Sequence, residues 1–174
     1  MHIVPWSSSD LDLLRQLNSH DMTSHLGGPE TEEQLLARHN RYTDAGEPGA
    51  GGMFRIVLLP KGLSVGSIGY WERTWQNEQV YECGWCVLPE FQGRGIAAAA
   101  TLPVIERARA EQWHAYLHAF PSVDHPASNR ICRKAGFTWV SECDFEYPAG
   151  RFMRCNNWRR DLVDNTPGRR GSLA

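Results

Sequence analysis

The chain has 174 residues, a net charge of -2 and 41% hydrophobic residues, which fits one ordinary domain able to bury a core. The small charge argues against nucleic acid as the main partner, and no apolar run approaches the ~20 residues of a membrane span. Residues 1–6 lack the regions of a signal peptide, and five scattered cysteines make no disulfide framework, so we expect a reduced, cytoplasmic protein.

The N-terminal third reads as a short strand and two helices separated by loops. Leucines at helical spacing predict the first helix, and a capping box at Thr31 and Gln34 opens the second. In chain order we expect a strand at 2–6, a helix of about ten residues from Leu11, a loop at 20–29, a helix from Thr31 to about Tyr42, and a flexible loop at 45–52.

The rest of the chain reads as an antiparallel meander followed by strands and helices in alternation. We expect strands at 54–59, 64–70 or beyond and 79–88, a helix at about 93–112, a strand at 115–120, a helix at 126–135, and strands at 137–146 and 152–158. Pro103 predicts a kink or a restart in the long helix. The order predicts a mixed α/β (α+β) fold with one central sheet. Residues 1–163 are expected to form a single domain, and residues 164–174 a disordered tail.

A glycine-bearing loop opens directly into the long helix. The first N–H groups of a helix have no intrahelical partner, and glycine lets an anion approach the backbone. Gly93 and Gly95 beside Arg94 therefore predict a cradle for a phosphorylated ligand. A dinucleotide-binding domain is disfavoured, because G-x-G-x-x-G would require a third glycine and a strand–helix–strand unit.

Residues 92–97, Gln-Gly-Arg-Gly-Ile-Ala, fit the pattern Q/R-x-x-G-x-G/A and resemble motif A of the GNAT superfamily of acetyl-CoA-dependent N-acetyltransferases. Residues 66–70, 81–89 and 128–137 resemble, in the right order, segments of the branch that contains the ribosomal-protein N-terminal acetyltransferases (RimJ/RimL-like). The resemblance covers residues 53–158. It implies the GNAT fold, with a mostly antiparallel sheet of six to seven strands, splayed at the cofactor site and flanked by about four helices.

The resemblance also implies the ligands and the residues that bind them. Acetyl-CoA would be the acyl donor and an amine the acceptor, with no metal, no nucleic acid and no membrane, in a possible homodimer. The strand before motif A would pair with the pantetheine, and the loop would hold the pyrophosphate. The cofactor-binding residues expected on this basis are Val87, Leu88, Gln92, Gly93, Arg94, Gly95, Ile96, Ala97, His125 and Asn129.

Direct acetyl transfer to an amine needs a proton acceptor, and the leaving thiolate can need a proton donor. Glu82 is the candidate base; the alternative is an ordinary strand carboxylate, or one that pairs with Arg73. Ser128 and Cys132 are the candidate acids. Cys132 stands where many relatives have tyrosine, and a buried inert cysteine is the alternative there. Ser128 matches the serine favoured in the ribosomal-protein branch, and could instead bond the backbone or the cofactor.

Three tryptophans, Trp71, Trp75 and Trp85, are candidates for the acceptor pocket, although core positions explain most of them as well. Acidic side chains near them would suit an amine, and the candidates are Asp21, Glu72 and Glu78. The C-x-x-C at Cys83 and Cys86 lies within a strand, where its two members point to opposite faces, so neither metal nor redox function is expected. The sequence thus predicts an N-acetyltransferase, with a non-catalytic acyl-CoA-binding sensor of the same fold as the alternative.

Overall fold

A computed structural model describes residues 1–44, 48–147 and 149–163, and it confirms a mixed α/β fold with one seven-stranded sheet. The expected tail at 164–174 and part of the expected loop at 45–52 lie outside the described residues. The strands are β1 His2–Pro5, β2 Gly51–Leu58, β3 Leu63–Trp75, β4 Glu78–Val87, β5 Tyr116–Ala119, β6 Thr138–Glu146 and β7 Phe152–Asp161. The α-helices are α1 Leu11–Leu17, α2 His20–Thr23, α3 Glu32–Thr43, α4 Ile96–Glu111 and α5 Pro126–Lys134, with short 3-10 helices η1 Ser8–Asp10, η2 Ser24–Leu26 and η3 Pro89–Phe91.

The sheet has the strand order β1-β2-β3-β4-β5-β7-β6, and only the β4–β5 pair is parallel. The predicted meander is therefore correct. Its tightest turn joins β3 to β4 through Gln76 and Asn77, whose φ angles of 50° and 66° suit a two-residue hairpin turn. The register of β3 on β4 then runs without a shift from Trp75 opposite Glu78 to Gly66 opposite Val87.

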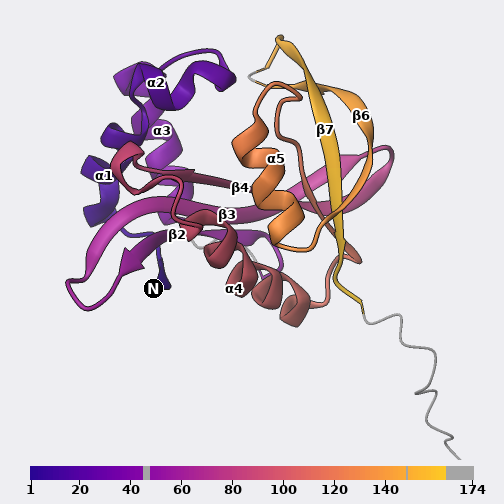
Figure 1. Cartoon of the computed structure of the whole chain (residues 1–174), viewed down its shortest axis with the longest axis horizontal. Helices are drawn as coiled ribbons and strands as arrows, with labels where there is room; N and C mark the ends of the chain where they lie inside the picture. Colours follow the sequence, from indigo (N-terminus) through magenta and orange to yellow (C-terminus); the bar gives the residue numbers. More distant parts are fainter. Residues whose placement is uncertain (45–47, 148, 164–174) are drawn as a thin grey trace, which may run out of the picture.

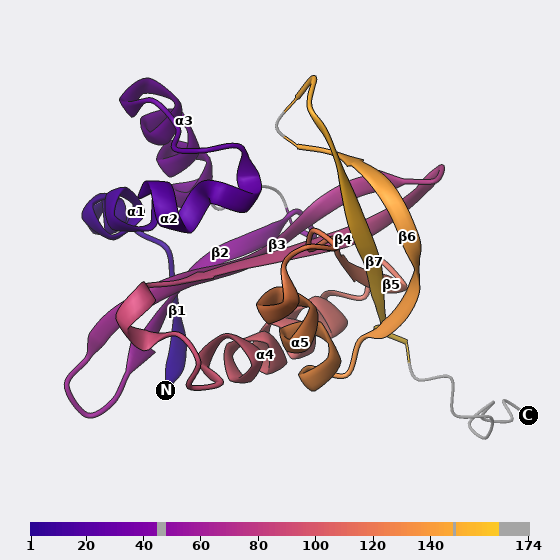
Figure 2. The same cartoon turned by 45° about the horizontal axis from the view of Figure 1, so that its top comes forward.

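Helices cover both faces of the sheet, as Figure 2 shows, with α1, α2 and α3 above it and α4 and α5 below. The α4 face is built from small and branched side chains, such as Ala100 and Val104, which are fully buried against the sheet. A second cluster forms on the opposite face around Trp6, Leu14 and Leu35. The sheet therefore separates two environments. In Figure 1 the N-terminal helices α1, α2 and α3 lie at the left of the molecule, and β6 and β7 at the right.

Several elements differ from the sequence-based expectations. The expected loop at 20–29 contains the helical turns α2 and η2. The long helix starts at Ile96 rather than near Gly93, because Gly93 and Gly95 have positive φ angles that a helix cannot hold. Pro103 lies inside α4, which continues to Glu111, so of the two expected outcomes the restart is wrong and the kink stays a prediction.

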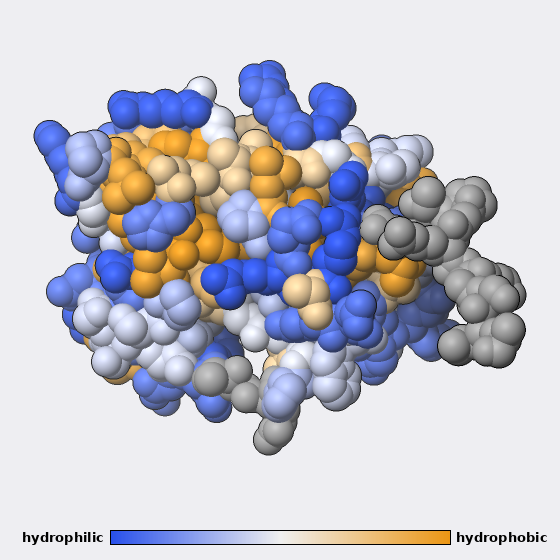
Figure 3. Space-filling model, turned by 90° about the horizontal axis from the view of Figure 1, so that it is seen from below, coloured by the Kyte–Doolittle hydropathy of each residue, from blue (hydrophilic) through white to orange (hydrophobic). Residues whose placement is uncertain are grey.

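The outer side of α4 is less apolar than its inner side. Seen from below, apolar atoms are mixed with hydrophilic ones over the surface (Figure 3). Leu102 is 53% exposed there, whereas Thr101 beside it is fully buried. No helix in the described part of the chain is long and apolar enough to cross a membrane.

Candidate active site

The sheet opens between its two parallel strands. β4 and β5 pair only at Tyr81 with Leu117 and at Glu82 with His118, and β5 ends at Ala119. Beyond that point β4 continues to Val87 with β3 alone as its registered partner. One edge of β4 therefore presents backbone N–H and C=O groups to the opening, as the edge strand of a sheet does.

The alternation of a strand decides which backbone groups face that opening. Leu88 donates its N–H to the Val65 carbonyl at 2.9 Å, and its carbonyl accepts from Phe91 N–H at 2.9 Å. The expectation that the Leu88 backbone lies open is therefore wrong. Because alternate residues direct their N–H and C=O groups to the same side, those of Trp85, beyond the last β4–β5 pair, face the opening instead. The Val87 carbonyl accepts a hydrogen bond from Gln92 Nε2 at 2.9 Å.

The loop after β4 forms an open cradle at the start of α4. A Cβ added to Gly93 or to Gly95 would meet no atom within 4 Å, and both glycines have positive φ, 73° and 77°. The first intrahelical acceptor is the Gly95 carbonyl, bonded by Ala99 N–H at 3.0 Å, so the N–H groups of the first turn have no intrahelical partner. An anion fits this place.

The other predicted cradle residues make contacts within the protein, and their expected contacts with the cofactor stay predictions. Arg94 donates to the Glu90 carbonyl at 2.7 Å, and its guanidinium lies 5.5 Å from the centre of the Phe91 ring. Gln92 ties the loop to β4 through the bond described above. Ile96 and Ala97 turn inward and pack in the main core, the cluster between α4 and the sheet that contains Ala100 and Val104.

Glu82 occupies the last paired position of β4, where the two strands part. Its side chain is 12% exposed, and Oε2 accepts a hydrogen bond from Arg73 Nη1 at 2.7 Å. Burial raises the pKa of Glu82, while Arg73 and the hydrogen bond from Trp71 act in the opposite direction; the net pKa is raised. The carboxylate is therefore a stronger base than an exposed glutamate.

The two candidate acids lie one turn apart on α5. Cys132 is completely buried in the main core, and burial raises the pKa of its thiol to about 12. It is a thiol at neutral pH and matches the inert cysteine considered from the sequence. Ser128 lies in the first turn of α5 and is partly exposed, on the same side of the helix as Cys132.

The buried side chain of Asn129 forms hydrogen bonds within the protein. Its Nδ2 donates to the carbonyls of Ser122 and His125, both at 2.9 Å. Its Oδ1 accepts from Asn156 Nδ2 at 2.8 Å and from Trp158 Nε1 at 2.9 Å. These four bonds fill the capacity of the amide, so the structure gives this side chain a role at the junction of α5 and β7. The expected contact of Asn129 with the cofactor stays a prediction.

His125 precedes α5 and stacks on His25 of η2, with ring centroids 4.2 Å apart and planes 16° from parallel. Burial and the neighbouring His25 lower the pKa of His125. The ring thus connects the N-terminal helices to α5, and its expected contact with the cofactor stays a prediction.

The three tryptophans lie in different surroundings. Trp71 stands opposite Glu82 in the β3–β4 register, and its ring covers Gly84, where an added Cβ would lie 3.0 Å from it. Trp75 packs on Phe120, with centroids 4.6 Å apart. Trp85 is an odd number of residues from Glu82, so it faces the opposite side and packs against the main core. Of the three, Trp71 lies directly beside the base.

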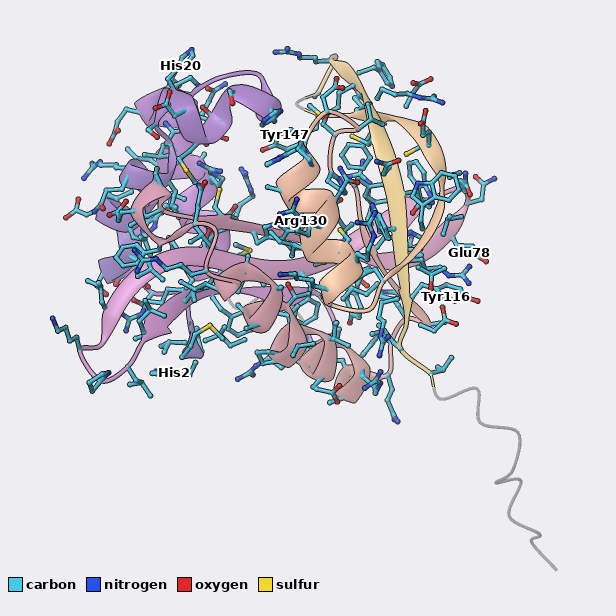
Figure 4. All side chains as sticks on the ribbon, viewed as in Figure 1. His2, His20, Glu78, Tyr116, Arg130 and Tyr147 are labelled. Atoms are coloured by element: carbon cyan, nitrogen blue, oxygen red, sulfur yellow. The ribbon has the colours of Figure 1, made fainter. Side chains whose placement is uncertain are left out.

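The acidic side chains expected near the acceptor lie in three different surroundings. Glu72 points to the other face of β3 and contacts His114 Nε2 at 2.9 Å. Glu78 and Tyr147 are far apart in Figure 4. Asp21 is exposed on α2.

Tyr147, which the sequence did not suggest, lies within electrostatic reach of Glu82, and Arg38 lies within reach of Tyr147. Burial raises the pKa of Tyr147, which also responds to the charges of Arg38, Glu30 and Glu82. Arg38 Nη2 forms an ion pair with Glu30 Oε2 at 2.8 Å. Tyr147 comes from the β6–β7 connection and Arg38 from α3, so only the folded chain brings them to this side of β4.

In the described ranges, no three His, Cys, Asp or Glu side chains are grouped to hold a metal ion. Cys83 is buried and Cys86 half-buried, on opposite faces of β4.

The sequence model of the acetyltransferase (GNAT) domain matches residues 1–138. This chain belongs to the GNAT acetyltransferase family. No curated protein sequence matched the chain. Among solved structures, a GNAT-family acetyltransferase from Bacillus anthracis aligns with a TM-score of 0.74 and 20% identity, covering 92% of this chain and 93% of that one.

Two further GNAT structures have acetyl acceptors in their names. Spermidine N-acetyltransferase from Vibrio cholerae, in complex with CoA and spermine, aligns with a TM-score of 0.73 and 15% identity, over 92% of this chain and 94% of that one. RimL, a ribosomal L7/L12 α-N-protein acetyltransferase in complex with coenzyme A, aligns with a TM-score of 0.69 and 16% identity, over 92% and 98%. At these identities the likeness concerns the GNAT fold alone.

Proposed function

We propose that this GNAT protein is an acetyl-CoA-dependent N-acetyltransferase that transfers an acetyl group directly to a primary amine. The observation that carries the proposal is the place of Glu82. A carboxylate with a raised pKa stands where β4 and β5 part, on the strand that leads into the glycine cradle. Base, open strand edge and anion cradle therefore follow one another along one continuous segment.

Acetyl-CoA fits the residues around the opening. Gly93 and Gly95 leave free space at the positive end of α4, where a pyrophosphate is favoured. The open backbone at Trp85 can pair with the pantetheine amides, as a further strand would. When bound, acetyl-CoA supplies an acetyl thioester to the reaction.

The residues of the chain supply the proton transfers. An amine is protonated at pH 7, and Glu82 takes its proton, directly or through a water, so that the neutral amine can attack. The second proton that the attacking nitrogen loses goes to water. Ser128 gives its proton to the departing thiolate and regains one from water; it is the better donor of the two candidates, because Cys132 has no exposed surface. Trp71, which covers Gly84 beside Glu82, forms one wall for the amine.

The acceptor proposed here is the α-amine of a peptide or a small-molecule primary amine. The two acidic groups that act on Tyr147, Glu82 and Glu30, each have an arginine partner, at 2.7 and 2.8 Å. The four charges cancel, so a polycation gains little attraction here. The motif resemblance to the ribosomal-protein branch also favours a peptide α-amine.

A non-catalytic acyl-CoA sensor is the second candidate. The observation that favours it is the Arg73–Glu82 ion pair, which would simply neutralise a structural carboxylate. Such a protein would bind acetyl-CoA at the same cradle and acetylate nothing.

Calorimetry with acetyl-CoA, followed by thiol release with an amine panel, separates these possibilities. The panel contains a tripeptide with a free α-amine, the same tripeptide acetylated at its N-terminus, spermidine and an aminoglycoside. We expect binding, and turnover with the free tripeptide but not with its acetylated control. Absence of binding at high micromolar acetyl-CoA overturns the proposal, and binding without turnover on any amine favours the sensor.

A further inference from the structure

The ion pair between Arg73 and Glu82 sits at the opening of the sheet. Glu82 lies opposite Trp71 in the register, and Arg73 is two residues further along β3 on the same face, so the two side chains meet diagonally. Arg73 Nη1 lies 2.7 Å from Glu82 Oε2, and the side chains are 28% and 12% exposed. The pair is therefore largely shielded from water, where a charge–charge contact is stronger than at the surface.

Aromatic rings from beyond the opening hold the arginine in place. The guanidinium carbon lies 4.1 Å from the ring centre of Phe145, on β6, and 5.9 Å from that of Phe120, which follows β5. Those two rings are stacked, with centroids 4.5 Å apart. A planar cation held over a ring has a defined orientation, which a lysine could not reproduce. The position of Arg73 is thus set by both sides of the opening.

Within the described part of the chain, Arg73 is the one charged group that acts on the pKa of Glu82. The titratable groups whose pKa values respond to Glu82 from the elements around it are Cys83 on β4, Cys155 on β7 and Tyr147 after β6. Burial raises the pKa of all three, so they stay neutral. Trp71 adds a hydrogen bond but no charge. The cation that balances the cost of burying the carboxylate is Arg73.

We propose that Arg73 is a positioning residue of the acetyl transfer, which keeps the Glu82 carboxylate ionised and in one orientation at the opening of the sheet. This inference rests on the proposed function of Glu82 as the base. It gives the ion pair a part in the reaction, whereas in the sensor alternative the pair only stabilises the fold.

The first measurement follows the carboxyl group itself. Proteins labelled with ¹³C at the glutamate side chains are titrated by NMR, and the Glu82 signal is assigned by its absence in Glu82→Gln. In Arg73→Met we expect the midpoint to rise by about 1–3 pH units, the effect of losing one opposite charge within a few ångströms. An unchanged midpoint in a folded Arg73→Met protein overturns the inference.

The second measurement is the pH profile of kcat with the best amine of the panel. In Arg73→Met the acidic limb moves to higher pH, by the same amount as the NMR midpoint. In Arg73→Lys the limb stays near its wild-type position while kcat falls, because the charge remains but the stacked, planar geometry is lost. Wild-type kcat in the Arg73→Lys protein would overturn the positioning part.

Arg15→Met is the matched control, since Arg15 pairs with Glu32 at 2.6 Å but is 46% exposed on α1. It should leave both the midpoint and the profile unchanged; if it shifts them equally, the effect is one of net charge and the inference fails. Near-UV circular dichroism checks that each variant is folded. If Arg73→Met does not fold, the kcat of Arg73→Lys still tests the positioning role of Arg73. If the wild-type protein acetylates no amine, the proposed function is wrong. If the wild-type protein is active but the acidic limb of the pH profile does not move in Arg73→Met, only this inference is wrong.

Discussion

Burial and one arginine act in opposite directions on the Glu82 carboxylate. Removal from water favours the protonated form, and the guanidinium at 2.7 Å favours the ionised one. A base must be ionised at the working pH and still bind a proton well, and the raised pKa meets the second condition. At the scale of the residue, the environment of Glu82 suits general-base chemistry better than an exposed strand position would.

Glu82→Gln should lower kcat by about 10²–10⁴-fold, because the amide keeps the shape of the side chain but accepts no proton. Acetyl-CoA affinity should stay unchanged, since the cradle is at the start of α4 rather than at Glu82. Steady-state kinetics and calorimetry on the same preparation measure both. Wild-type turnover in Glu82→Gln would remove Glu82 from the reaction.

The junction of α5 with β7 depends on one buried amide. Asn129 bonds two carbonyls and two side-chain donors across these elements. The end of α5 is fixed separately, because Gly136 has a φ of 79° and Phe137 N–H bonds the Cys132 carbonyl at 3.0 Å, a glycine-terminated helix stop. α5 is thus held at both ends, which fixes the first turn that carries Ser128.

Asn129→Ala should lower the free energy of unfolding by about 1–3 kcal/mol or more, because buried partners lose their hydrogen bonds. Acetyl-CoA affinity should change little in the protein that remains folded. Urea unfolding and calorimetry test this, with exposed Asn40→Ala on α3 as the control. Normal stability with strongly weakened acetyl-CoA binding would instead support the sequence-based assignment of Asn129 to the cofactor.

The loop between β4 and α4 depends on backbone conformations with positive φ, which residues other than glycine rarely adopt. Gly95→Ala should weaken acetyl-CoA binding at least tenfold, because a Cβ would occupy the cradle where the phosphate approaches. It should also cost about 1–2 kcal/mol of stability from its positive φ.

Gly62→Ala separates those two effects. Gly62 has a φ of 66° and free space around an added Cβ, as Gly95 has, but it lies in the β2–β3 turn. We expect a similar loss of stability and no loss of affinity, measured by urea unfolding and calorimetry. Equal affinity losses in the two variants would mean that the cradle is not the anion site.

At the scale of the whole molecule, the stability of the fold depends on pH through one buried histidine, His118, which folding keeps uncharged. His118 is 5% exposed, and its Nδ1 lies 2.7 Å from Asn157 Oδ1. Burial lowers its pKa below the ordinary 6.5. The unfolded chain therefore binds this proton more readily than the folded protein, so stability is lost as the pH falls below about 6.5. Glu82 acts in the opposite sense, because its pKa is raised in the folded protein.

His118→Gln should flatten the pH dependence of stability between about pH 7 and pH 5, because glutamine does not titrate. Urea unfolding of both proteins at several pH values gives the difference, in which the contribution of Glu82 cancels. Parallel stability curves would show that His118 does not cause the acid sensitivity.

The sequence alone determined the features that depend on local chemistry. Glycines at positions 93 and 95, a proline-terminated strand and an alanine-rich helix follow one another within a short stretch, so the cradle could be predicted from residue types and spacing. The capping box at Thr31 and Gln34 is also local, and both of its hydrogen bonds are formed. The resemblance placed Glu82 on the strand before the cradle, because the motifs that carry it are also read from short stretches of sequence.

Only the tertiary structure decided which side chains meet at the opening. Arg73 reaches Glu82 diagonally across two strands and is held by Phe145 from β6, while Asn129 is taken up by β7. Leu88 turned out to bond β3, because the strand's alternation depends on its register. Such contacts join residues far apart in the chain, and their geometry follows from strand order, register and packing, which no local pattern encodes.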